Sequence, residues 1–281
     1  MNTYTLNSGD LMPVLGIGTF MMTPDEAETS VRRALANGYR LIDTANAYVN
    51  EKAVGRGIRA FGLARREIFL ETKLWPTLYR DVTAVDRTLE RLGTDFIDLM
   101  LLHQPAGDWQ AGYRLLEQGV QAGKIHSIGL SNFNREQIET ILKNCTTRPS
   151  VVQVECHPYY PQDELRAFLA GEGIRLQAWF PLGHGDKSLL GQPVFVRLAE
   201  KYGKTPGQVI LRWHIQKGNI VIPGARSEAH IRDNIDIFDF ALTGDEMEEI
   251  AALDRHVPFV THDEADMDRY LHWDLDIDGQ A

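Results

Sequence analysis

Eight short apolar runs, each followed by a stretch long enough for a helix, organise this sequence. The runs cover residues 15–19, 40–43, 68–73, 97–103, 125–131, 151–155, 175–179 and 219–223. Their first residues are 25, 28, 29, 28, 26, 24 and 44 positions apart, and the first six intervals each have room for one strand, one loop and one helix. Apolar runs without polar alternation are typical of parallel strands covered on both faces, and eight such strands close a barrel. The sequence therefore predicts an α/β fold, a (β/α)8 TIM barrel.

The segments outside these runs predict two additions to the barrel. Segments 3–6 and 11–14 flank Asn7-Ser8-Gly9-Asp10, so residues 1–14 are expected to form a hairpin cap. The long last interval has room for an extra helix over 193–202. Residues 255–281 lack helical periodicity and are expected to form an irregular arm that docks through aromatic side chains, with its aspartates facing solvent. No low-complexity linker interrupts the chain, so residues 1–281 are predicted to be one domain.

Charge and composition exclude several classes of partner. The formal net charge of −10 would repel nucleic-acid phosphates and anionic lipid, so neither nucleic acid nor membrane is expected as a partner. No apolar run approaches the roughly 18 residues that a membrane-spanning helix requires. The chain has two cysteines and no leader pattern at its start, which favours a reducing, cytoplasmic location.

Four titratable side chains occur where predicted strands end. Asp43 and Lys73 are the last residues of the second and third runs, His103 ends the fourth, and Tyr48 follows Asp43 by five positions. The carboxyl ends of barrel strands share one rim, so these groups are expected to converge there. Burying such charges without partners costs several kcal/mol, which favours a functional cluster over four unrelated side chains.

Five ordered motifs around these residues resemble the aldo-keto reductase family. They are GYRLIDTANAYVNEKAVG at 38–55, LETKLW at 70–75, LLHQP at 101–105, GLSNF at 129–133 and QVECHPY at 153–159. The similarity spans nearly the whole chain and is strongest in appearance to the bacterial 2,5-diketo-gluconate and glyoxal reductases. The resemblance implies a monomeric barrel that reduces small aldehydes or ketones with NADPH and without a metal.

Simple chemistry supports catalytic roles for the same four residues. Hydride delivery to a carbonyl carbon builds negative charge on its oxygen, which a positioned acid must neutralise, and Tyr48 is the candidate. The cation of Lys73 would assist the phenol, and Asp43 would hold that cation in place. His103 would donate a hydrogen bond to the substrate oxygen and orient the carbonyl.

The resemblance also implies a cofactor site. Ser131, Asn132 and Gln153 match residues that bind the nicotinamide carboxamide, and Trp179 takes the place of an aromatic residue that stacks on the ring. The complete expected set is Gly18, Thr19, Phe20, Asp43, Ser131, Asn132, Gln153, Trp179, Leu182, Gly224, Ala225, Arg226, His230 and Asn234.

The segment expected to bind the adenosine 2′-phosphate departs from the family pattern. Gly224 and His230 stand where many members carry a lysine and an arginine. Arg226 and a helix that starts at Ser227 would then supply most of the attraction for the phosphate. NADPH is the expected cofactor, with a smaller preference over NADH than in members that carry both cations; NAD is a possible alternative.

Aromatic residues predict the character of the substrate mouth. The expected substrate contacts are Tyr48, Trp75, His103, Trp109 and Phe180, joined by Phe259 and Trp273 of the arm. Two other functions stay open: a nicotinamide-binding regulatory subunit with slow turnover, and a metal-dependent hydrolase. The complete set of four favours an enzyme over the first. The second needs His or Asp ligands at several strand ends, and only His103 and Asp43 are available there, which disfavours it.

Overall fold

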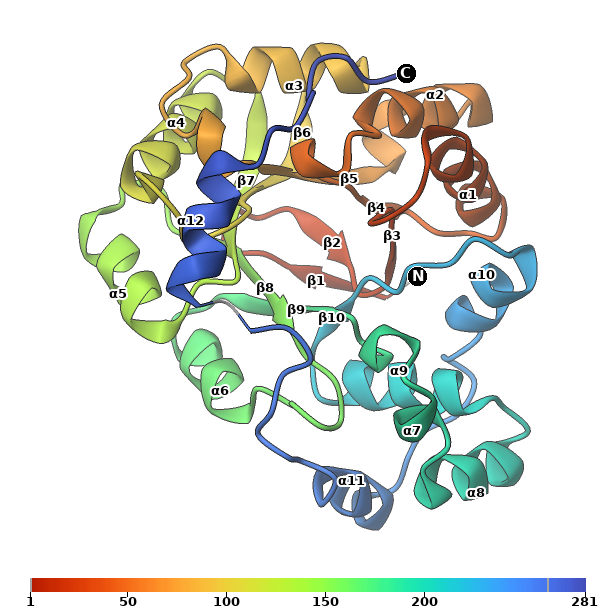
Figure 1. Cartoon of the computed structure of the whole chain (residues 1–281). Coiled ribbons are helices and arrows are strands. Elements are labelled where there is room, and N and C mark those ends of the chain that lie inside the picture. Colours follow the sequence, from red (N-terminus) through yellow and green to blue (C-terminus); the bar gives the residue numbers. More distant parts are fainter. Residues whose placement is uncertain (1, 262) are drawn as a thin grey trace.

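The eight apolar runs form a parallel barrel in the computed structural model, which describes residues 2–261 and 263–281. The barrel strands are β3 (Gly16–Gly18), β4 (Leu41–Asp43), β5 (Phe69–Leu74), β6 (Ile97–Leu102), β7 (Ile125–Ser131), β8 (Val151–Glu155), β9 (Arg175–Trp179) and β10 (Ile220–Val221). Each strand pairs in parallel with the next along the chain. Parallel bridges from Leu15 to Val221 and from Gly18 to Gly224 close the ring, which confirms the (β/α)8 prediction (Figure 1).

Helices surround this barrel (Figure 1). They are α1 (Pro24–Ala36), α2 (Glu51–Phe61), α3 (Ala84–Leu92), α4 (Trp109–Gln121), α5 (Arg135–Asn144), α6 (Asp163–Gly171), α7 (Lys187–Leu190), α8 (Pro193–Tyr202), α9 (Pro206–Gln216), α10 (Glu228–Ile235), α11 (Gly244–Ala251) and α12 (Glu264–His272), with short 3-10 turns η1 (Asn46–Tyr48), η2 (Arg65–Glu67), η3 (Pro76–Leu78) and η4 (Gly183–Gly185). Local sequence fixes several helix starts: Thr23 and Thr205 form capping boxes, each followed by a proline. Gly93 ends α3 in the left-handed conformation, at φ +64°.

The lower half of the barrel interior is apolar and closed. Its filling comes from Leu41, Phe69, Leu99, Leu101, Val151, Ile220 and Ile222. The hairpin of β1 (Thr3–Thr5) and β2 (Leu11–Pro13) adds Leu6 and Met12 to the same cluster and covers the amino-terminal end, visible through the barrel in Figure 1. The polar strand ends therefore gather at the opposite, carboxyl-terminal rim.

The arm differs from the sequence-based expectation. It contains the nine-residue helix α12, so the prediction of an irregular arm is wrong over that stretch. Asp263 is the N-cap of α12 and forms a capping box with Asp266. These two aspartates were expected only to face solvent, and they also determine where the helix begins. The extra helix expected over 193–202 is present as α8. None of the helices in the described part of the chain has the length and apolar character needed to cross a membrane.

Candidate active site

Three of the four candidate catalytic residues meet directly at the carboxyl-terminal rim. Lys73, on β5, donates hydrogen bonds from Nζ to Asp43 Oδ1 on β4, to the Thr44 carbonyl oxygen at 2.9 Å and to Tyr48 Oη at 3.2 Å. Asp43 is 1% exposed and Lys73 is fully buried. The turn η1 presents Tyr48 above the ammonium group, which also lies 4.8 Å from the centre of the phenol ring.

Burial and charge act in opposite directions on this cluster. Burial raises the pKa of Tyr48 to about 12, although the nearby Lys73 cation lowers it in part. Burial would lower the pKa of Lys73, but opposing interactions, led by the ion pair with Asp43, outweigh burial and raise this pKa above its ordinary value. At neutral pH the phenol is therefore protonated and the lysine is charged. Because Lys73 donates to Tyr48 Oη, the phenol hydrogen is left to donate elsewhere.

His103 joins the cluster through ring contacts. It follows β6, and its backbone N–H donates to the Leu74 carbonyl oxygen at 3.0 Å. Its imidazole lies edge-on to Tyr48, with ring centres 5.7 Å apart, and edge-on to Trp75, with ring centres 5.1 Å apart. The structure therefore brings all four candidate catalytic residues together.

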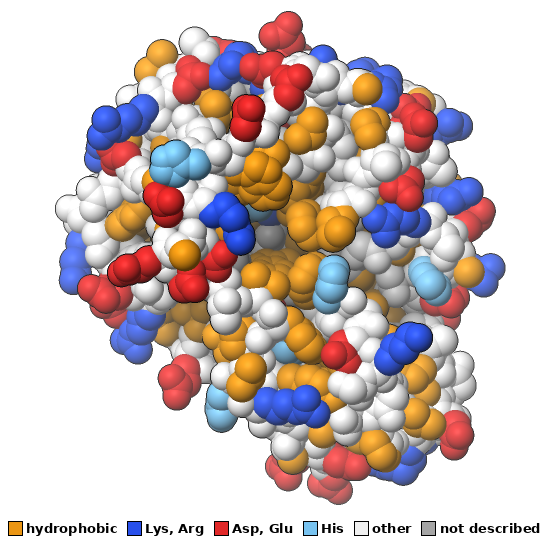
Figure 2. Space-filling view, viewed as in Figure 1, with side chains coloured by type: hydrophobic (Ala, Val, Ile, Leu, Met, Phe, Trp, Pro, Cys, Tyr) orange, Lys and Arg blue, Asp and Glu red, His pale blue; other side chains and the backbone are white. Residues whose placement is uncertain are grey.

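An aromatic edge extends from this cluster along the rim. Trp179 donates from Nε1 to Asn132 Oδ1 at 2.8 Å, and its ring lies 4.7 Å from that of Phe180. Phe20 lies between Phe180, at 6.2 Å, and Tyr48, at 5.1 Å between ring centres. Figure 2 shows a hollow at the centre of this face, surrounded mainly by hydrophobic side chains. This edge provides flat apolar surfaces beside the polar cluster.

Residues expected around the nicotinamide share the same rim. Thr19 donates from Oγ1 to the Asp43 carbonyl oxygen at 3.0 Å. Ser131 pairs in register with Gln153 across β7 and β8, and both are buried. Asn132 has a left-handed backbone, φ +67°, and donates from Nδ2 to Gln104 Oε1 at 3.1 Å. Asparagine adopts this conformation more readily than most residues, and here it places the Asn132 side chain between Gln104 and Trp179.

The residues expected at the 2′-phosphate lie after β10 and at the start of α10. Gly224 bridges Gly18, which places this loop against the first barrel strand. Ser227 caps α10 by accepting a hydrogen bond from the His230 N–H at 3.2 Å. Three other residues of the expected cofactor site differ in burial. Ala225 and Asn234 are buried, and Leu182, directly before η4, is half-buried.

Arg226 already has partners on the neighbouring loop and helix. Its Nε lies 3.2 Å from Glu26 Oε1, and its Nη2 donates to the Met21 carbonyl oxygen. The side chain is 52% exposed, so the guanidinium group remains accessible. The sequence analysis missed Glu26, because α1 and the segment after β10 are about 200 residues apart in the chain.

Two expected substrate contacts, Trp75 and Trp109, pack against other aromatic side chains. Trp75 is 2% exposed because Tyr270 and Trp273 of the arm pack edge-on against it, with ring centres 5.4 and 5.7 Å away. Trp109 packs edge-on against Phe133, at 5.6 Å, rather than against the central cluster. Phe259, expected near the mouth, packs on His157 at 4.7 Å. Of the two arm aromatics expected at the mouth, Trp273 therefore packs against Trp75, which in turn packs against His103.

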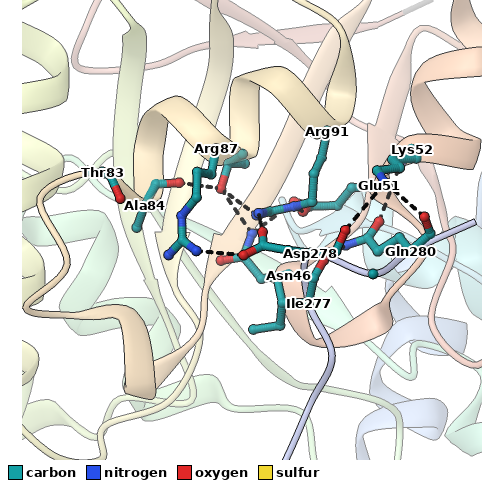
Figure 3. A network of polar contacts seen from close by, with 12 residues as sticks. Asn46, Glu51, Lys52, Thr83, Ala84, Arg87, Arg91, Ile277, Asp278 and Gln280 are labelled. Atoms are coloured by element: carbon teal, nitrogen blue, oxygen red, sulfur yellow. Dashed lines mark hydrogen bonds and ion pairs between the residues drawn. The ribbon is translucent and has the colours of Figure 1, made fainter.

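A partly buried polar network connects the end of the chain to the turn that carries Tyr48 (Figure 3). Asp278 accepts hydrogen bonds from Arg87 and, at 2.7 Å, from Arg91 Nη1. Arg91 Nε donates to Glu51 Oε2 at 2.7 Å, and Glu51 Oε1 accepts from Asn46 Nδ2 at 3.0 Å. Asn46 is the first residue of η1.

This network was not found by sequence analysis, which expected the arm's aspartates to face solvent. Asp278 is 51% exposed and does face solvent as expected, but it also accepts hydrogen bonds from Arg87 and Arg91. Two arginines spaced four residues apart on α3, Arg87 and Arg91, are the local signal that an anion could be bound there, but nothing local indicates which anion.

We expect Asp278→Asn to loosen the arm without unfolding the barrel. Asp278 is half exposed and Arg91 keeps its partner Glu51, so the expected cost is about 1 kcal/mol. Limited proteolysis within 255–281 should then be about five times faster, since this free energy is roughly a fivefold change in the open fraction. The matched control is Asp274→Asn, which neutralises an exposed aspartate of the same arm. Equal cleavage rates for both variants would contradict the role of Asp278.

Across the described residues, no three histidine, cysteine, aspartate or glutamate side chains are grouped as metal ligands would be.

Comparison with known proteins identifies relatives over most of the chain. The model of the aldo/keto reductase family matches residues 14–255. An aldo-keto reductase of Mycolicibacterium smegmatis is 44% identical over 260 residues, which cover 89% of this chain and 92% of the relative. A glyoxal reductase of Bacillus subtilis is 43% identical, over 90% of this chain and 93% of its own. The crystal structure of an aldo/keto reductase from Brucella melitensis superposes with a TM-score of 0.86 at 42% identity, covering 90% of this chain and 99% of that one.

Proposed function

The chain belongs to the aldo/keto reductase family and is an oxidoreductase, and from this premise we propose that it reduces small aldehydes or ketones with NADPH, using Tyr48 as the general acid. The observation that carries the proposal is the contact of Tyr48 Oη with the buried Lys73 ammonium group, itself held by Asp43. A phenol fixed beside a cation at an open rim is suited to giving a proton to a developing alkoxide.

The residues present fit a nicotinamide dinucleotide. NADPH, when bound, supplies the hydride. Trp179 offers a half-buried ring whose orientation is fixed by its hydrogen bond to Asn132. From there the edge continues through Phe180 and Phe20 to Met21, whose carbonyl oxygen is bound by Arg226. A flat aromatic surface at one end and an exposed cation with a helix start at the other suit an elongated ligand with a ring and a phosphate.

Each chain group then has a distinct task in the proposed reaction. Tyr48 donates its proton to the carbonyl oxygen, and Lys73 stabilises the phenolate that this leaves. His103 donates a hydrogen bond to the same oxygen and orients the carbonyl group. Asp43 fixes the lysine through their buried ion pair. Phe180, which packs against Trp179 and Phe20, excludes water from one side of the substrate.

The direct test is a panel of aldehydes and ketones assayed with NADPH and with NADH. We expect turnover of several carbonyls, with small aldehydes such as dicarbonyls included because a relative of this chain is named a glyoxal reductase. Stoichiometric binding of NADPH without turnover of any panel member would instead support the nicotinamide-binding regulatory function. An NADH preference would overturn the choice of nucleotide while leaving the reductase function intact.

A pair of substitutions tests how the phosphate is bound. Arg226→Ala should weaken NADPH binding by about 1.5 to 3 kcal/mol and leave NADH binding nearly unchanged, because it removes a charged hydrogen-bond donor that only the 2′-phosphate would use. Glu26→Gln should act in the opposite direction, since the carboxylate that now pairs with Arg226 competes with the phosphate. Fluorescence titration with both cofactors measures these changes. Parallel changes for NADPH and NADH would show that Arg226 does not bind the phosphate.

A further inference from the structure

A second carboxyl group, Glu71, lies inside the barrel below the proposed catalytic cluster. Glu71 is on β5, two residues before Lys73, and is fully buried. It pairs in register with Asp43 on β4 and with Leu99 on β6. The apolar filling of the lower barrel lies beneath it, so water does not surround this carboxyl group.

The amide groups of two glutamines hold both oxygens of Glu71. Gln153 Nε2, from β8, donates to Glu71 Oε1 at 2.9 Å. Gln177 Nε2, from β9, donates to Glu71 Oε2 at 2.9 Å. The Gln153 amide nitrogen also lies 2.9 Å from Gln177 Oε1 and 3.2 Å from Asp43 Oδ1. Glu71 is thus the centre of a polar layer between the apolar filling and the rim.

The charges in this layer balance only if one carboxyl group carries a proton. The titratable groups facing Glu71 are Asp43, Lys73 and Tyr48, and the strands β8 and β9 contribute neutral amides. One buried cation can neutralise one carboxylate, and Lys73 binds Asp43. A second buried carboxylate beside the first would be strongly disfavoured. Burial, the adjacent Asp43 charge and a hydrogen bond with Asp43 together raise the pKa of Glu71 well above its ordinary value.

We propose that Glu71 is a positioning residue that stays protonated in the folded protein, donates its proton in a hydrogen bond to Asp43 and fixes the orientation of the Gln153 amide. Two consequences follow for the site. The proton keeps Glu71 neutral, so the field of Lys73 at Tyr48 is opposed by one carboxylate instead of two. Glu71 holds the nitrogen of the Gln153 amide, so the carbonyl oxygen of that amide faces the rim instead of the barrel interior. At the rim, a carboxamide N–H of the cofactor could donate a hydrogen bond to this oxygen. This second consequence rests on the proposed cofactor.

The proton itself can be tested without any assay of activity. A folded state that keeps a proton which the unfolded chain releases becomes less stable as pH rises above the ordinary glutamate pKa. Glu71→Gln removes the ionisation while keeping the shape. We expect the unfolding equilibrium constant of the wild type, divided by that of Glu71→Gln, to rise about tenfold per pH unit between about pH 5.5 and 7.5 in urea titrations. A ratio that stays constant over this range would overturn the proposal.

An infrared measurement on the unmutated protein keeps the test independent of the variant's folding. In the infrared spectrum at neutral pH, a protonated carboxyl group gives a C=O stretching band that a carboxylate lacks. If 13C labelling of the glutamate carboxyl carbons shifts such a band, the band belongs to a protonated glutamate. The other well-buried glutamates have cationic or hydrogen-bonding partners of their own, as Glu51 does with Arg91. Absence of any protonated glutamate band at pH 7 would refute a neutral Glu71.

The orienting role has its own variant. Glu71→Leu cannot hold the Gln153 amide, so NADPH and NADH should both bind about tenfold more weakly, whereas Glu71→Gln should bind both normally. The two cofactors are affected equally because they share the nicotinamide. Normal binding by a folded Glu71→Leu variant would overturn the orienting role. If neither cofactor binds the wild type, the proposed function fails, and the pH and infrared results still decide the protonation.

Discussion

Tyr48→Phe is expected to lower kcat about 10²- to 10⁴-fold, the usual contribution of general acid catalysis, while NADPH affinity stays nearly unchanged. Lys73 Nζ donates a hydrogen bond to the phenol oxygen of Tyr48 at 3.2 Å. The phenol hydrogen is not used in that contact, and it is the proton proposed to pass to the substrate. The ring itself remains, so its packing against Phe20 and His103 should persist. Steady-state and single-turnover kinetics, with a cofactor titration, measure both effects.

The control for this variant is another buried tyrosine that loses only a hydroxyl group. Tyr113 donates to the Thr147 carbonyl oxygen at 2.8 Å, on the outside of the barrel in α4. Tyr113→Phe should lose about 1 kcal/mol of stability and keep its turnover. If Tyr48→Phe retains more than half of the wild-type single-turnover rate, Tyr48 is not the acid.

Lys73→Met is expected to reduce kcat/KM by at least about 10²-fold and to destabilise the fold by about 3 to 5 kcal/mol at neutral pH. The ammonium group has three partners, and its loss leaves Asp43 as a buried carboxylate without a cation. The pKa of Tyr48 should also rise further, because Lys73 is the group that lowers it. The alkaline limb of the kcat/KM profile should move to higher pH accordingly.

The stability loss in Lys73→Met should depend on pH with a definite sign. Without the cation, the pKa of Asp43 in the folded state should rise above its value in the unfolded chain. The variant then holds a proton that the unfolded chain releases, so its deficit relative to the wild type should be small near pH 4 and grow toward pH 7. Urea unfolding at several pH values measures this dependence.

A double variant separates activity from stability. Adding Asp43→Asn to Lys73→Met removes both partners of the buried pair, which should restore most of the lost stability but none of the activity. Recovery of turnover in the double variant would show that the lysine serves only to neutralise Asp43.

The barrel could be predicted from the sequence because its signal is local and repeated. Eight apolar runs, the first seven at nearly constant spacing, leave few alternatives. The rule that strand ends share a rim then brings Asp43, Lys73 and His103 together before any coordinates are known. Tyr48 required the additional resemblance to a family, since a tyrosine in a loop has no spacing rule of its own. The same resemblance led to the family assignment that the comparisons confirm.

Features that depend on distant pairs could not be predicted in this way. Glu71 is a single acidic residue inside an apolar run, and its importance comes from glutamines on two other strands. The pairing of Glu26 with Arg226 joins segments with no common pattern. Trp75 was expected at an open mouth, but the arm covers it, and local sequence does not place an arm. The roles of the cofactor residues remain predictions for the same reason.

The link between Asp278 and α3 also has a consequence for synthesis of the protein. Arg91 and Asp278 are 187 positions apart. The ribosome therefore adds Arg91 to the growing chain long before it adds Asp278. At synthesis rates of about 5 to 20 residues per second, Arg91 would spend roughly 10 to 40 seconds without this partner. During that interval Trp75 lacks its cover as well, because Tyr270 and Trp273 are also still to come. Nascent chains of this protein should therefore expose an apolar patch at the rim, a site for chaperone binding that closes when the arm emerges.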